Sequence, residues 1–255
     1  MIISGIAYST AMIGLNELWY KNAPRQSFRF FNDNKEWNQV DKVGHLFSTF
    51  YLSYGTSTIL SSMGFPSKRA NVTGALTGFL AMVPIEIMDG FSAQYGASWG
   101  DLAGNAMGSL LFIGQTLAWK EVRIFPKYSF HRTSYAPLRP NLLGNGWSSE
   151  WLKDYNGQTY WLSLDMDQFM RFPKWLNIAL GYGAEGMVSA NRISNIQNGY
   201  DPYRKYFLSI DLDLKAIPTR SKGLKTLAFI VSMIKLPAPT LSFSRKGTVF
   251  HPFYF

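Results

Sequence analysis

Three long stretches without a charged side chain constrain the fold of this 255-residue chain more than any other feature. No Asp, Glu, Lys or Arg occurs in residues 43–67, 70–85 or 102–119, which are 25, 16 and 18 residues long. A membrane-spanning helix needs about 20 mostly apolar residues, a length that only 43–67 reaches comfortably. We therefore expect residues 1–125 to form a bundle of apolar helices embedded in a membrane. The alternative is the buried helical core of a soluble protein.

Small residues recur at helical spacing within these stretches. Gly74 and Gly78 lie four residues apart, as do Gly100, Gly104 and Gly108, so each set occupies one face of its helix. Such faces allow helix backbones to approach closely. In water each glycine would cost its helix up to about 1 kcal/mol relative to alanine, so their number favours the membrane-embedded bundle.

The pattern changes to alternation after Pro126. Residues 160–167 and 206–213 are two similar octets in which apolar and polar side chains alternate, which is typical of strands with one wet face. We expect residues 126–255 to form an antiparallel β-rich domain of five or six strands. It should contain one helix near 222–234 and a hairpin turn at 245–247. The predicted fold class is α+β.

Composition and net charge limit the classes of molecule that this protein is expected to bind. The net charge is +9, but the 25 Lys and Arg residues are scattered and no nucleic-acid-binding motif accompanies them, so we expect no nucleic acid partner. A basic surface that faces a membrane explains the charge. The absence of cysteine excludes disulfides, thiolate metal sites and a lipid anchor on cysteine in this sequence. Residues 1–15 lack a basic region and a cleavage site, so we expect a retained helix, or a start located after a lost signal peptide.

Polar residues flank or enter the apolar stretches at helical spacing. Asp41 and His45 are four residues apart, Glu86 and Asp89 three, and Asp101 and Asn105 four, so each pair shares a helix face. Ionisable groups at membrane depth usually face a bundle interior or a wet cavity, so we expect these groups to converge at one end of the bundle. The candidate binding residues are Asp41, Lys42, His45, Glu86, Asp89, Ser98, Asp101 and Asn105.

Three roles fit these residue types. The groups can pair with one another and lock the helices together. Alternatively, His45 is a general base oriented by Asp41, and Lys42 holds a phosphate or another anionic head group. In the third role, the carboxylates and His45 hold a divalent metal that activates water. No cofactor motif is present, so a divalent metal is the one cofactor that these residues suit.

The pattern Asp41-Lys42-x-x-His45, then Glu86, then Ser98-x-x-Asp101-x-x-x-Asn105-x-x-Gly108 resembles VanZ-like membrane proteins over residues 41–115. The chain resembles more closely the YfiM-like family of unknown function, bacterial envelope proteins described as predicted periplasmic or outer-membrane lipoproteins. Four stretches carry this second resemblance: 14–20, 31–37, 153–161 and 181–187. It implies a location in the bacterial cell envelope, on the outer-membrane or periplasmic side.

Together these observations predict a noncatalytic, uncharacterised envelope membrane protein. Its polar cluster would stabilise the bundle or bind an anionic lipid or cell-wall precursor head group, with membrane lipid and envelope proteins as partners. One alternative is a membrane-embedded hydrolase that acts on a lipid-linked phosphate or peptide with the help of a metal or His45. Another is an outer-membrane β-barrel that ends at the aromatic Phe255. Whether the chain is an enzyme stays open at this point.

Overall fold

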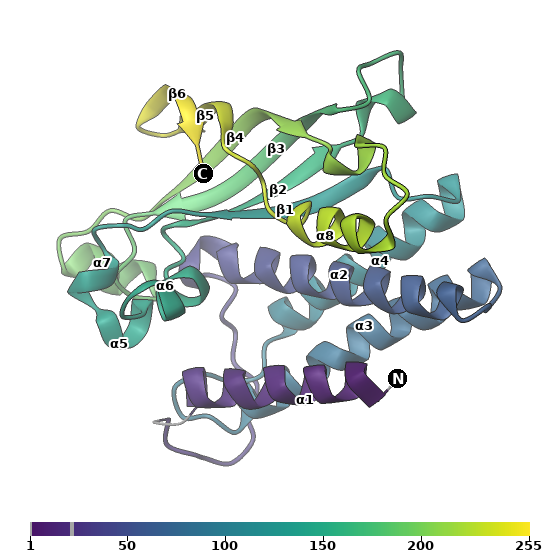
Figure 1. The fold of residues 1–255 in the computed structure, drawn as a ribbon. Coiled ribbons are helices and arrows are strands. Elements are labelled where there is room, and N and C mark those ends of the chain that lie inside the picture. The colour runs from purple at the N-terminus through teal and green to yellow at the C-terminus, as the bar shows by residue number, and fades with distance from the viewer. Residues whose placement is uncertain (1, 21–22) are drawn as a thin grey trace.

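The computed structural model describes residues 2–20 and 23–255, and it confirms the predicted α+β class (Figure 1). The helical part comes first and an antiparallel sheet follows it. The long helices are α1 (Ile2–Leu15), α2 (Val40–Ser62), α3 (Ser67–Gly90) and α4 (Trp99–Trp119). The strands are β1 (Ile124–Phe130), β2 (Gln158–Leu164), β3 (Leu176–Glu185), β4 (Tyr203–Leu212), β5 (Ala238–Ser244) and β6 (Gly247–Tyr254). Shorter helices are α5 (Pro140–Leu143), α6 (Trp147–Lys153), α7 (Arg192–Gln197) and α8 (Lys222–Val231).

The charge-free stretches do form helices, but residues 43–67 do not form a single membrane-length helix. Helix α2 ends at Ser62, and a turn with Gly64 at φ +88° leads to Pro66, which precedes α3. Within the described parts of the chain, only α3 combines the length and the apolar composition needed to cross a membrane. Of its most apolar window, 28% is buried inside the molecule. Membrane embedding of the bundle therefore stays a prediction.

The glycine faces bring α3 and α4 close to the backbone of α2. A Cβ atom added to Gly78 of α3 would lie 2.6 Å from the backbone nitrogen of Ser53 in α2. One added to Gly108 of α4 would lie 2.3 Å from the carbonyl oxygen of Leu46, also in α2. These contacts explain the predicted spacing, because any side chain at these positions would push the helix backbones apart.

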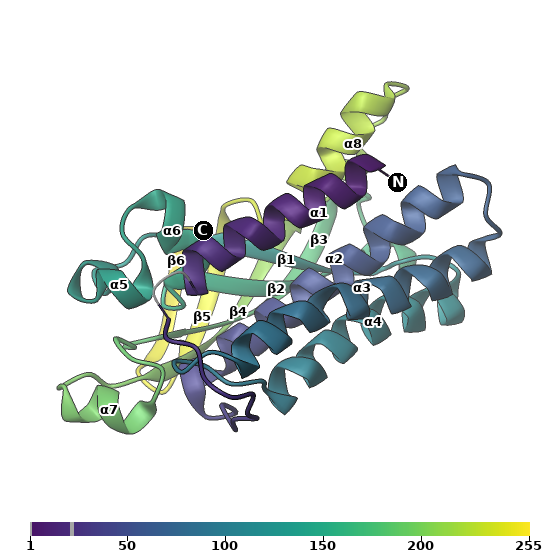
Figure 2. The same ribbon diagram turned by 90° about the horizontal axis from the view of Figure 1, so that it is seen from below.

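The sheet has six strands in chain order, with each strand antiparallel to its neighbours. Helix α2 packs against it (Figures 1 and 2). Aromatic rings from both elements meet in this contact. The ring centroid of Phe47 lies 6.2 Å from that of Tyr128 and 5.9 Å from that of Tyr160. The hydroxyl of Tyr51 donates a hydrogen bond of 2.7 Å to the carbonyl oxygen of Pro126. The helices and the sheet thus share one packed interface.

The face of the sheet that is buried is the opposite of the one predicted. The alternation within the strands is correct, but the polar face is buried and the apolar face is exposed. Ser163 and Asp211 are fully buried, whereas Leu180 is 51% and Ile210 is 43% exposed. Buried polar groups of this face pair with one another, since Asp211 pairs with the ammonium group of Lys127 at 2.5 Å and accepts a hydrogen bond of 2.6 Å from Ser163. The prediction of a wet polar face is therefore wrong.

The sheet curls around this polar face. Trp161 of β2 and Phe207 of β4 both contact the ring of Tyr254 in β6, with centroids 6.0 and 4.7 Å away. Residues 233–235 cover the free edge of β1 through two backbone hydrogen bonds with Tyr128. The outer-membrane barrel alternative is not supported, because β1 and β6 are the two ends of the strand order in the described chain and Phe255 lies after the last strand.

Substitutions on α4 test the close helix packing. Gly108→Ala places a methyl group against the backbone of α2 and is expected to lower the free energy of unfolding by about 1–3 kcal/mol. Gly114→Ala is the matched control, because no atom described in the structure lies within 4 Å of the added Cβ. It should raise the stability by up to about 1 kcal/mol. Urea unfolding followed by circular dichroism measures both, and equal effects would contradict the packing.

Candidate functional site

A buried ammonium group forms the centre of the polar cluster. Lys42 donates three hydrogen bonds through its Nζ atom, to Asp33 at 2.6 Å, Asp41 at 2.9 Å and Asp101 at 2.9 Å. Asp33 belongs to the loop before α2, whereas Asp101 lies in the first turn of α4. Because an ammonium group has three donors, this arrangement uses them all. The arrangement favours the predicted pairing of Lys42 with carboxylates, and its predicted role as the holder of an anionic head group stays a prediction.

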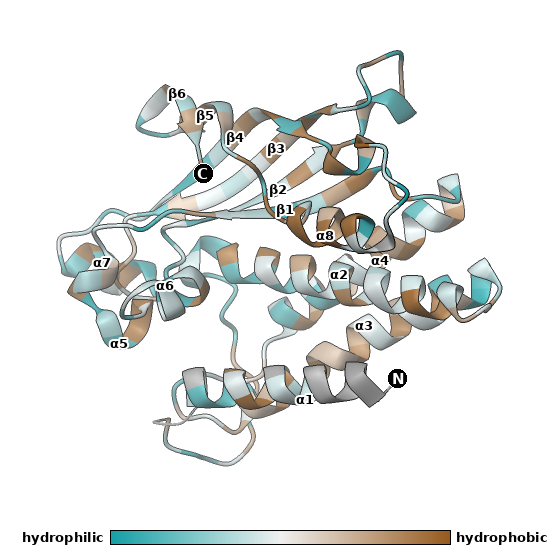
Figure 3. Ribbon diagram, viewed as in Figure 1, coloured by the Kyte–Doolittle hydropathy of each residue, from teal (hydrophilic) through white to brown (hydrophobic). Residues whose placement is uncertain are grey.

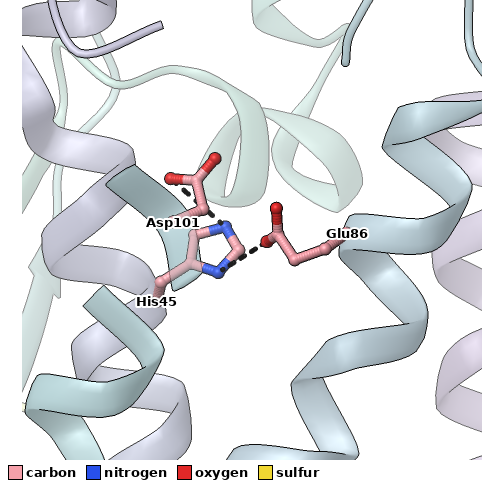
Figure 4. Close-up of side chains that lie close together, drawn as sticks. All are labelled: His45, Glu86 and Asp101. Carbon is pink, nitrogen blue, oxygen red and sulfur yellow. Dashed lines mark ion pairs between the residues drawn. The ribbon is translucent and has the colours of Figure 1, made fainter. Parts of the chain in front are cut away.

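His45 lies one turn further along α2 and between two carboxylates from different helices (Figure 4). Its Nδ1 atom is 3.5 Å from Glu86 Oε1 on α3, and its Nε2 atom is 3.9 Å from Asp101 Oδ1 on α4. The Nδ1 atom also lies 3.1 Å from Asn105 Oδ1. The partners of the imidazole are therefore Glu86, Asp101 and Asn105, and the prediction that Asp41 orients it is wrong.

The other predicted residues occupy the margin of this cluster. Ser98 caps α4, because its hydroxyl accepts hydrogen bonds from the backbone nitrogens of Gly100 and Asp101 at 3.0 and 3.2 Å. Asn105 accepts a hydrogen bond of 2.9 Å from Thr49. Asp89 points to a different partner, the hydroxyl of Tyr20, which donates to it at 2.7 Å. The structure thus brings together seven of the eight predicted residues and leaves Asp89 beside them.

Sequence reasoning missed Asp33 and Tyr20. Both lie outside the charge-free helices, Asp33 in a loop and Tyr20 at the end of the π-helical turn Asn16–Tyr20 that continues α1. Asp33 falls within the stretch 31–37 and Tyr20 within the stretch 14–20, which both carry the YfiM-like resemblance, and this was the available signal. The position of Asp33 depends on a strained connection, because Trp37 and Asn38 have φ values of +45° and +49° immediately before α2. Non-glycine residues rarely adopt this region unless surrounding contacts hold them there.

Burial and charge shift the pKa values of these groups in opposite directions. Burial raises the pKa of Asp41 to about 6, although Lys42 opposes the shift. Burial also acts on Asp33, but the hydrogen bonds from Lys42 and Ser98 outweigh it and hold its pKa below the usual value. For His45, burial would lower the pKa, but the charges of Asp101 and the other nearby carboxylates outweigh burial and raise it.

The cluster forms one end of a cavity of about 650 Å³ between α1, α2, α3 and the sheet. Along α2 the cavity wall changes from Asp41 and His45 to Leu52, and along the antiparallel α3 from Asp89 to Met82. Carboxylates dominate the polar end, which is lined by Asp33, Glu36, Asp41, Asp89 and Asp101. Glu86 lies beside the imidazole of His45, and the cationic Lys42 pairs with three of the lining carboxylates. The cavity therefore has an acidic end and an apolar end, in a chain whose net charge is +9.

Comparison with known families finds one match, which lies in the helical region. Residues 29–113 match the family model described as "Predicted periplasmic lipoprotein (DUF2279)". The matched segment is one third of the chain and contains Asp33, Lys42, His45, Glu86 and Asp101. No curated protein and no solved structure matches the chain. The match supports the expected uncharacterised envelope protein on the periplasmic side, and the VanZ-like resemblance stays a prediction.

Removal of the central cation tests the cluster. Lys42→Met leaves three carboxyl groups without their common partner and is expected to lower the free energy of unfolding by about 3–5 kcal/mol at neutral pH. The exposed Lys68→Met is the control and should change it by less than about 0.5 kcal/mol. Thermal unfolding monitored by circular dichroism measures both effects.

The pH dependence of this loss follows from the charges. A lowered pKa gives Asp33 a stabilising effect in the wild type that is lost only as pH falls through that lowered value. In Lys42→Met the buried carboxyl groups instead gain stability by taking up protons. The difference between the two proteins should therefore be largest above pH 6 and shrink in acid. A difference that is independent of pH would show that the three carboxylates are not the groups destabilised.

Proposed function

We propose that this protein is a cell-envelope protein that binds an amphiphilic molecule, a lipid or a lipid-linked precursor, in the cavity between its helices and its sheet. The supporting observation is the ordering of the cavity wall from acidic to apolar. The distance along α2 from Asp41 to Leu52 is roughly 16 Å at 1.5 Å per residue, which suits an acyl chain with its head group at the acidic end.

The acidic end constrains the head group. Five lining carboxylates, with Glu86 beside His45, face two cationic groups at most, so a positively charged or hydroxyl-rich head group is attracted and a bare phosphate is repelled. Trp19 and Trp37 also line the cavity, and the ring of Trp19 already holds the ammonium group of Lys153 at 5.4 Å from its centroid. The predicted anionic head group therefore requires a bridging cation. The sequence analysis predicted that the polar cluster stabilises the bundle or binds a head group. In this proposal it does both, since it joins the helices and borders the cavity.

A cavity-filling variant tests this proposal. Ser48 lies on α2 between the acidic and apolar ends, and Ser48→Phe should weaken the binding of dodecyltrimethylammonium, measured by calorimetry in the presence of EDTA, by about tenfold or more. The control is Thr58→Phe, an exposed position on the same helix outside the cavity wall, which should bind like the wild type. Equal affinities in all three proteins would exclude the cavity as the binding site. Release of inorganic phosphate from dodecyl phosphate would instead favour the hydrolase alternative, in which His45 activates water.

Contact with membrane lipid is the second part of the proposal. Exposed apolar side chains lie on α8, namely Leu224, Leu227 and Ile230, and others lie on the sheet, such as Leu208 and Ile210. Figure 3 shows hydrophobic residues in both elements. Basic residues lie at the ends of the neighbouring helices: Lys68 and Arg69 at the start of α3, Lys120 after α4, and Arg220 and Lys225 at the start of α8. These ends lie at the same end of the molecule (Figures 1 and 2). Apolar side chains beside basic ones suit a bilayer that contains anionic lipid.

Vesicle flotation tests the contact with lipid. Leu227→Glu should reduce binding to vesicles of phosphatidylethanolamine and phosphatidylglycerol by about tenfold or more, because the variant loses the transfer of one leucine side chain and gains a repelled charge. Gln197→Glu adds the same charge at an exposed position on α7 and should bind like the wild type. A wild type that fails to float with vesicles would refute the contact.

A further inference from the structure

One carboxylate oxygen in the cluster has no role in the packing described so far. Glu86 is 3% exposed, and its Oε2 atom accepts a hydrogen bond of 3.2 Å from the backbone nitrogen of Ser98. Its Oε1 atom is buried, faces the ring of His45 at 3.5 Å and accepts no hydrogen bond from any residue that the structure describes. A buried carboxylate oxygen without a donor is costly, so this atom requires a further partner.

Two groups of acidic and histidine side chains in the cluster are close enough to hold a cation, and they share Asp101. Only one of them has members, His45 and Glu86, for which the structure gives no ion pair with Lys42. Asp33, Asp41 and Asp101 already surround the ammonium group of Lys42, which occupies the position that an ion would take. His45, Glu86 and Asp101 offer one ligand atom each, and these atoms lie within 4.8 Å of one another. Three different helices supply them (Figure 4).

We propose that His45, Glu86 and Asp101 bind a divalent first-row transition-metal ion. One imidazole and two carboxylates are ligands for ions such as Mn²⁺ and Zn²⁺. Metal–ligand bonds of about 2.0–2.2 Å require the three atoms to approach by roughly 1 Å, which side-chain rotation supplies. The dication also neutralises the two carboxylates and gives Glu86 Oε1 its missing partner.

The surroundings of His45 support this role. Asn105 Oδ1 lies 3.1 Å from Nδ1 and accepts a hydrogen bond of 2.9 Å from the hydroxyl of Thr49. When Nδ1–H donates to Asn105, an outer hydrogen bond of the kind that metal-binding histidines use, Nε2 is the nitrogen left for the ion, and Glu86 turns toward it by side-chain rotation. Gly104 of α4 packs against the base of this side chain, and a Cβ atom there would be 3.2 Å from the Cβ of His45. The glycine therefore allows α4 to bring Asp101 close to the imidazole.

Titration with Mn²⁺ alone tests the site, with free Mn²⁺ counted by electron paramagnetic resonance. We expect one tightly bound ion in the wild type. Glu86→Gln and His45→Gln should bind it about tenfold more weakly or worse, since the loss of even an outer partner costs about 10–100-fold. Glu36→Gln is the matched control, because Glu36 lines the same cavity and loses the same charge without contributing to the three ligands. It should bind like the wild type.

Two results would overturn the metal site. One is a folded wild type, verified by circular dichroism, that binds no Mn²⁺ tightly. The other is an equal loss in Glu36→Gln, which would indicate general attraction to an acidic cavity. If Glu86→Gln does not fold, Glu86→Asp takes its place, because it keeps the charge but withdraws the carboxylate by one methylene group. Its affinity should also fall by about tenfold or more, and unchanged affinity would contradict the site.

A bound ion also defines the class of head group, an inference that rests on the proposed amphiphile binding. With the dication present, the acidic end of the cavity attracts phosphate through the metal. Dodecyl phosphate should therefore bind about tenfold more tightly with Mn²⁺ than with EDTA, whereas dodecyltrimethylammonium should gain nothing. Mn²⁺ binding without binding of either amphiphile would refute the proposed function and keep the metal site. Amphiphile binding without Mn²⁺ binding would refute the metal site and keep the proposed function.

Discussion

The buried ammonium group of Lys42 is the interaction on which the helical part depends. It joins a loop residue, Asp33, to the first turns of α2 and α4, and so fixes where three segments of the chain meet. An ammonium group taken out of water is costly unless it is fully paired, and here each of its donors meets a carboxylate. The carboxylates in turn make this end of the cavity acidic. One interaction therefore determines both the packing and the electrostatic character of the site.

The molecule combines this polar cluster with an unusual distribution of apolar surface. The sheet buries Ser163 and Asp211 against other polar groups and exposes Leu180 and Ile210, and α8 also exposes apolar side chains. In water such a surface is unfavourable, whereas at a lipid membrane it is expected. The matched family of predicted periplasmic lipoproteins is consistent with that environment. A cavity with one acidic end beside such a surface suits a molecule that is itself part lipid and part polar.

Much of the site was predictable because it lies on regular helices. The spacing of four residues between Asp41 and His45, and between Asp101 and Asn105, was enough to predict that each pair shares a helix face. The glycine spacing likewise predicted the close contacts of α2. Asp33 was not predictable in this way, since loops have no periodicity and its position depends on contacts with α4. The partner of His45 was also misassigned, because helical spacing indicates which residues share a face but not which residue of another helix lies opposite.

The sequence by itself determined the division into a helical part and a following antiparallel sheet, the glycine faces, and most of the polar residues that converge. These features depend on local periodicity, which is written in consecutive residues. Only the tertiary structure decided which face of the sheet is buried, that Lys42 is fully engaged by carboxylates, and that Glu86 Oε1 faces His45 without a donor among the described residues. The alternation of polar and apolar residues along a strand is the same whether the polar or the apolar face of the sheet is buried. The choice depends on side chains distant in sequence, such as Tyr254 against Trp161.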